Sequence, residues 1–71
     1  MFTKKHPGLN RKVLVNLISG NAIEGVLTKK TRDLYLIRAA IVHEPGSEPA
    51  RVEGEIAIET VNVDYVQLLL V

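Results

Sequence analysis

Few side chains in this sequence have the types and spacing that catalysis requires. Glu53 and Glu55 are two residues apart in an alternating stretch, which puts both carboxylates on one face of a strand, as in a general acid–base pair. The same spacing is typical of a solvent-facing strand edge, and we favour that interpretation. Ser19 and Ser47 fall in expected turns with no histidine close in the sequence. We therefore expect no catalytic residues and no enzymatic activity.

The sequence also offers little for binding a metal or cofactor. It contains no cysteine, which excludes disulfides and thiolate metal sites. His6 and His43 are far apart, and a zinc site needs more ligands than two histidines, so we interpret both as solvated surface residues. No phosphate-binding glycine loop is present. We expect neither a metal nor a cofactor.

Basic residues suggest a weak nucleic-acid contact. Lys29, Lys30 and Arg32 lie in a charged stretch, and Tyr35 beside them is the one candidate ring for stacking on bases. A basic, solvated loop explains the same residues. Eight of the nine basic residues precede Ala39, whereas six of the eight acidic residues follow it. Such polarity suits a nucleic-acid face or head-to-tail contact between copies, unless neighbouring strands mix the charges in space.

The elements that position these residues are short strands. Apolar residues alternate with polar ones in runs bounded by turn residues such as Ser19-Gly20-Asn21 and the loop 44–49. The run 34–43 fits helix or strand, and we choose strand because it is rich in β-branched residues and lacks a helix cap. The expected strands are 12–17, 22–27, 34–43, 52–58 and 65–70, with a charged loop at 29–33 and a polar break at 59–64 that allows one helical turn.

Together these runs predict an all-β fold, a small, strongly bent, five-stranded antiparallel barrel with little or no helix. Residues 1–10 form a tail or short cap, and residues 11–71 form the domain. Gly25 inside a strand indicates a tight bend or a close backbone approach. Tyr65 is expected to pack inside. The expected core consists of Val13, Val15, Leu17, Ile23, Leu27, Leu36, Ile56, Ile58, Val63 and Val66.

The small size and the C-terminal residues indicate partners. A chain of 71 residues buries a modest core, and small domains often gain stability by oligomerisation. Successive residues of a strand face opposite sides, so the terminal leucines cannot all enter one core, although simple fraying of the end is an alternative. The expected edge for self-association or docking comprises Tyr65, Val66, Leu68, Leu69, Leu70 and Val71. No signal peptide or membrane-spanning run is evident, so we expect a soluble, intracellular protein.

The first hairpin resembles the first motif of the Sm-like proteins. That motif has an apolar strand, a turn glycine, a second glycine and a leucine two residues later, as at Gly20, Gly25 and Leu27. The stretch 58–66 has the layout of the second Sm motif. In this family, uridine is held by a loop asparagine and an Arg-Gly pair, but this chain has no such asparagine and carries Glu59-Thr60 instead. We therefore do not transfer the uridine pocket.

The sequence also resembles small Sm-like proteins encoded by tailed phages of actinobacteria. The similar stretches are 43–46 (HEPG), Gly54-Glu55 and 62–68 (NVDYVQL). This resemblance implies a non-enzymatic structural or assembly protein of the virion, such as a minor capsid, decoration, head–tail or tail protein. It also implies a homo-oligomer or a complex with other virion proteins, located in the virion or the cytoplasm of the infected host. In Sm-like rings the fourth strand of one copy pairs with the fifth strand of the next, so the resemblance implies contacts between the strands expected at 52–58 and 65–70. The alternative is an Sm-like ring that binds single-stranded RNA.

Overall fold

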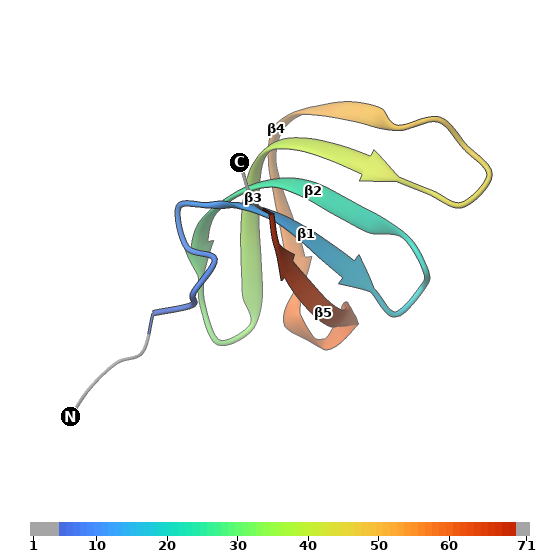
Figure 1. Cartoon of the computed structure of the whole chain (residues 1–71). Helices are drawn as coiled ribbons and strands as arrows, with labels where there is room; N and C mark the ends of the chain where they lie inside the picture. Colours follow the sequence, from blue (N-terminus) through green and yellow to red (C-terminus); the bar gives the residue numbers. More distant parts are fainter. Residues whose placement is uncertain (1–4, 70–71) are drawn as a thin grey trace.

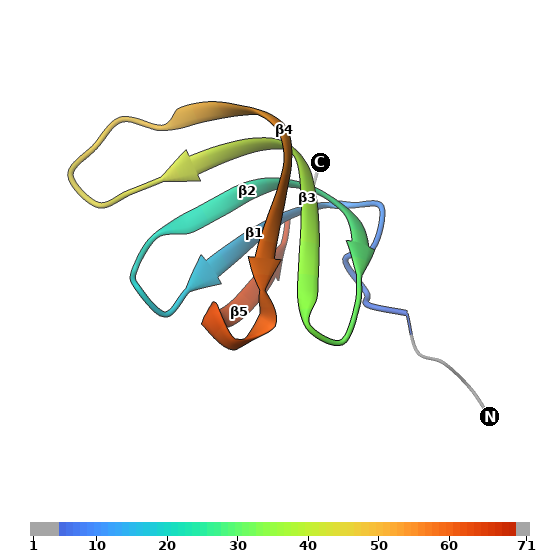
Figure 2. The ribbon, with the colours of Figure 1, turned by 180° about the vertical axis from the view of Figure 1, so that it is seen from behind.

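The computed structural model describes residues 5–69, and these form one bent antiparallel sheet with five strands (Figures 1 and 2). The all-β fold predicted from the alternating pattern is confirmed. The strands, in the spatial order β4-β3-β2-β1-β5, are β1 (Lys12–Leu17), β2 (Ala22–Lys30), β3 (Leu34–His43), β4 (Ala50–Glu59) and β5 (Val63–Leu68).

Three of the four strand pairings join neighbours in the sequence, and the fourth brings β5 back beside β1. A single 3₁₀ turn, η1 (Thr60–Asn62), occupies the expected polar break between β4 and β5. The structure shows no pairing of β4 with β5 in the described residues, so the strongly bent antiparallel sheet that the sequence predicted is not closed between these two strands. Within residues 5–69 no helix is long and apolar enough to cross a membrane.

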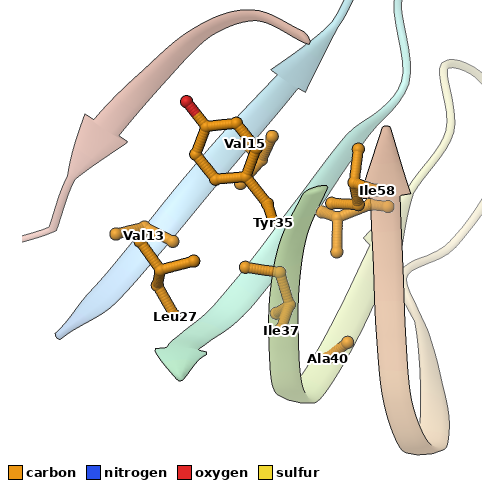
Figure 3. Close-up of a cluster of buried hydrophobic side chains, with 8 residues drawn as sticks. Val13, Val15, Leu27, Tyr35, Ile37, Ala40 and Ile58 are labelled. Carbon is orange, nitrogen blue, oxygen red and sulfur yellow. The ribbon is translucent and has the colours of Figure 1, made fainter. Parts of the chain in front are cut away.

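The core lies on the concave face of the sheet, where side chains of β1, β2, β3 and β4 meet (Figure 3). Leu9, Leu17, Val42, Ile56, Val63 and Val66 pack around it while remaining partly exposed. The fully buried side chains at its centre are Val13, Val15, Leu27 and Ile37. Most of the predicted core is therefore present, but β3 contributes different residues from those expected.

The prediction of Leu36 as a core residue is wrong. Tyr35 and Ile37 face the core instead, with 8% and 0% exposed, and Leu36 lies between them on the opposite face. Strand β2 also runs to Lys30, into the stretch that we expected to be loop, and pairs with the start of β3. The error arose because β3 is apolar on both faces, so its pattern did not reveal which set of alternate residues is buried.

The bend of the sheet follows irregularities in three adjacent strands. Gly25 faces β3 so closely that a Cβ would lie 2.5 Å from Ile37 Cγ2 and 2.7 Å from the Arg38 carbonyl oxygen. Across from it, Ala39 has a φ of 54°, and the pairing of β3 with β4 shifts at this point. Gly54 in β4 has a φ of 83°. These features curve the sheet (Figure 1), as the sequence predicted at Gly25.

Candidate functional site

Strand β5 is one free edge of the sheet, because it pairs with β1 on one side and with no described strand on the other. Tyr65 is 55% exposed and Leu68 is 37% exposed. Val66 packs partly against the core, and the Leu69 N–H donates to the Lys12 carbonyl at 3.0 Å. The structure thus places the described part of the predicted edge together. Leu70 and Val71 lie outside the described residues.

Tyr65 does not pack in the core as expected. It pairs with Asn16, whose side-chain amide donates to Gln67 Oε1 at 3.0 Å on the exposed face of the sheet. The pairing shifts by one residue between Asn16 and Leu17, where Leu17 meets Val63. This β-bulge turns Tyr65 outward. The sequence did not predict the bulge, because the stretch alternates regularly and contains no glycine.

Strand β4 is the other free edge, because among residues 5–69 it pairs only with β3. Its first six residues, 50–55, are all exposed, and the pair Val52 and Ala40 faces the concave side. Val52 is 37% exposed although its partner Ala40 is buried. The sequence placed Val52 on the inner side of its strand, and the Sm-like resemblance implied that this strand is an edge that pairs with the last strand of another copy. Gly54 within the strand was the available signal of an irregular edge.

The two carboxylates considered as an acid–base pair, Glu53 and Glu55, are exposed on this edge. Glu55 Oε2 accepts a hydrogen bond from Thr28 Oγ1 at 2.9 Å, and Thr28 Oγ1 is also 3.2 Å from the Leu36 carbonyl oxygen. Glu55 therefore ties β4 to β2 across β3. This arrangement links three strands of the sheet.

The residues considered for nucleic-acid contact are close in space, but they do not present a free ring. Lys29 and Arg32 are exposed at the turn between β2 and β3. Lys30 Nζ lies 4.8 Å from the centre of the Tyr35 ring. That ring is 8% exposed and belongs to the core, with its hydroxyl directed away from the other labelled side chains (Figure 3). Burial raises the pKa of Tyr35 above 10.0.

Neither histidine is a freely solvated side chain, contrary to our expectation. Nε2 of His43 is 3.0 Å from Glu24 Oε1, and Lys12 Nζ is 3.3 Å from Glu24 Oε2. Glu24 thereby joins β1, β2 and β3 on the outer face and mixes charges from the two halves of the chain. Its hydrogen bond with His43, and then the contact with Lys12, hold the pKa of Glu24 below 4.5.

The other histidine, His6, lines a depression of about 350 Å³ between the N-terminal segment and β5. Its ring meets Tyr35 edge-on, with centroids 5.5 Å apart. Thr60 from η1 also lines this depression, and its buried hydroxyl oxygen has no protein hydrogen-bond partner among the described residues. The sequence did not predict this arrangement. His6-Pro7-Gly8 indicates a turn, but it does not show what the histidine ring contacts.

In the described residues no group of three or more histidine, aspartate or glutamate side chains is arranged to hold a metal ion. The features with most capacity for binding are therefore the two open strand edges and the depression beside β5. No protein-family model matches the chain, and no curated protein matches it either.

Proposed function

We propose that this chain is a structural or assembly subunit that acts through pairing of its two free sheet edges. The observation that carries the proposal is the open sheet, which leaves β4 and β5 unpaired on their outer sides. Unpaired main-chain N–H and C=O groups on an edge can accept another strand. Because the two edges are different strands of one chain, β4 of one copy can pair with β5 of the next.

Apolar residues on both edges support this mode of contact. Leu68 on β5 lies opposite the buried Val13, and Val52 on β4 lies opposite the buried Ala40, so both apolar side chains face the concave side. Each is 37% exposed in the single chain. Pairing of the edges would join two partly covered apolar margins and remove them from water, which favours association.

Such contacts are heterologous, because one edge meets the other. They close into a ring or continue as a filament, depending on the rotation between successive copies. The sequence resemblance to phage Sm-like proteins supports the further proposal that these assemblies are part of a virion, as a minor capsid, decoration or connector component. A different virion protein that adds a strand to the same edge would use the same chemistry.

Sedimentation analysis of the purified chain tests the self-association. Val52→Lys and Leu68→Lys each place a charge on one edge, and we expect each to weaken association at least about tenfold in Kd, the effect of roughly 1.4 kcal/mol. Ile18→Lys is the matched control, because Ile18 is 69% exposed in the turn after β1 and belongs to neither edge strand. Urea unfolding of each variant separates lost association from lost folding.

The proposal is wrong if the wild-type chain is monomeric at tens of micromolar and the β4 and β5 variants do not differ from Ile18→Lys. The virion location has its own test, which is mass spectrometry of purified phage particles from the source lysate. If the chain is absent from the particles, the proposed virion location is wrong. The proposed pairing of the sheet edges is then tested by sedimentation alone.

A further inference from the structure

The segment His6–Arg11, which we call the N-terminal latch, is held on the sheet by main-chain hydrogen bonds. The Asn10 N–H donates to the Leu27 carbonyl at 2.6 Å, and the Leu27 N–H donates to the Arg11 carbonyl at 3.1 Å. Leu9 is half-buried and packs against the core. The latch therefore binds to Leu27 in the second half of β2 and covers the adjacent part of the core.

The latch also covers the concave face of β5. The Gly8 backbone lies so close to its neighbours that a Cβ would be 2.8 Å from Val13 Cγ1 and 2.9 Å from Leu68 Cδ2. His6 lines the depression on this side together with Val66 of β5. Displacement of the latch would expose apolar surface of Val13, Val66 and Leu68 next to the free edge.

One hydrogen bond within the latch depends on the charge of a histidine. The Gly8 N–H donates to His6 Nδ1 at 2.9 Å, so Nδ1 must carry a lone pair, and the ring must be uncharged with its proton on Nε2. Protonation of Nδ1 would set two N–H donors against each other. The same protonation would place a second cation beside the Tyr35 ring, which is 5.5 Å from the His6 ring between centroids and 4.8 Å from Lys30 Nζ.

The titratable groups around His6 come from three strands and from the latch itself. Lys30 from β2 and Tyr35 from β3 flank the ring, and Asp64 and Tyr65 of β5 line the same depression. Within and beside the latch, Lys5 and Arg11 are both exposed. Asp64 is the group in this set that favours an imidazolium, whereas the cations oppose it.

The balance of these effects favours the uncharged ring at neutral pH. Burial first, and then the charge of Lys30, lower the pKa of His6 below 6.5. A group whose pKa is lowered in the folded state stabilises that state fully above its ordinary pKa, and the contribution is lost as the pH falls through the lower value. The contacts of His6 therefore favour a bound latch at neutral pH and a weakened latch in mild acid.

We propose that the N-terminal latch is a proton-released cover, closed over the concave face of β5 when His6 is uncharged and released when Nδ1 is protonated. Release exposes an apolar strip beside the β5 edge without unfolding the sheet. This device needs only the single chain, so it stands or falls independently of self-association.

Amide hydrogen exchange followed by NMR on the full chain tests the latch, at about pH 7.5 and about pH 5, on either side of the histidine range. The probes are the Gly8 and Asn10 amides, with rates corrected for intrinsic exchange. His6→Asn is the key variant, because its side-chain oxygen can accept the Gly8 N–H two residues on and does not titrate. His43→Gln controls for the second histidine, and Lys30→Gln removes the neighbouring charge.

We expect the wild type and His43→Gln to lose severalfold in protection of the Asn10 amide at the acidic pH, while His6→Asn keeps its protection. Lys30→Gln should release at higher pH than the wild type, because removal of a cation raises the pKa of His6. Equal protection of the wild type at both pH values, or an equal loss in His6→Asn, would overturn the proposal. If the latch is released at the acidic pH in a chain that sediments as a monomer, the latch proposal is supported and the proposal of assembly through the sheet edges is wrong.

Discussion

Gly25 shows how one residue sets the shape of this molecule. Its position in the middle of β2 leaves no space for a side chain, because Ile37 and the backbone of β3 approach it directly. Its φ is not in the left-handed region, so the requirement for glycine is steric. The sequence predicted a close approach at this point because glycine is otherwise unfavourable inside a strand. It did not indicate which strand would approach.

We predict that Gly25→Ala lowers the free energy of unfolding by about 3 kcal/mol, at the upper end of the usual cost of overpacking. Gly46→Ala is the matched control, because Gly46 has a φ of 78° and open space around it, so it should cost only about 1 kcal/mol of backbone strain. Urea unfolding measures both. Equal losses in the two variants would contradict the steric explanation.

Glu24 is the residue that most clearly links stability to pH on the outer face. Its pKa is lowered by His43 and Lys12, so its contribution to stability is present above about 4.5 and is lost as the pH falls through the lower folded value. We predict that Glu24→Gln flattens the decline of unfolding free energy in this acidic range. Glu53→Gln, which changes an exposed carboxylate on β4, is the control and should leave the decline as in the wild type.

At the scale of elements, the strands follow the sequence pattern except where a bulge changes their register. The alternation in β1 and β2 correctly predicted Val13, Val15, Ile23 and Leu27 as buried. The pattern failed in β3, which is apolar on both faces, and at the bulge beside Tyr65. A bulge inserts one residue and reverses the faces that follow it, which alternation alone cannot reveal.

The bulge in β3 yields a prediction at Ala39 and its neighbour. Ala39 has a φ of 54°, where glycine is favoured by about 1 kcal/mol, but glycine also gains entropy in the unfolded chain. Ala39→Gly should therefore change the free energy of unfolding by less than about 0.5 kcal/mol. Ala40→Gly, which removes a methyl group that is 2% exposed, should cost about 1–2 kcal/mol. Thermal or urea unfolding measures both variants. A larger loss of unfolding free energy in Ala39→Gly than in Ala40→Gly would contradict the prediction.

At the scale of the whole molecule, the sequence predicted the five strands, and the Sm-like resemblance implied that the fourth and fifth strands supply the pairing edges. The sequence could not predict that the sheet remains open, because closure depends on the summed bend and twist of all five strands. The expected polarity of charge is reduced where Glu24 joins Lys12 and His43 across three strands. The packing of the His6 ring against Tyr35 joins segments that are distant in the sequence, and the sequence pattern could not predict it.

We predict that the chain does not bind oligo-uridine tightly or in preference to oligo-cytidine. The Tyr35 ring is occupied by core packing, and Glu59 presents a carboxylate beside Arg32 and Asp33, where phosphate would be repelled. Weak binding that disappears with added salt is consistent with contacts from Lys29 and Arg32, because phosphate contacts carry little sequence information. Fluorescence anisotropy at two salt concentrations measures this. Submicromolar, salt-resistant binding with uridine preference would refute the prediction.

The return of β5 to β1 has a consequence for the order in which the chain folds. Strands β1 to β4 follow one another through short turns, whereas the Asn16–Gln67 contact joins residues 51 positions apart. Closing so long a loop is entropically costly, so the four-strand meander should form early and β5 should dock late. Val66→Ala should then accelerate unfolding and leave the folding rate nearly unchanged, whereas Val15→Ala should slow folding. One of the two strands that offer a free edge is thus also the last to join the fold and the first to leave it.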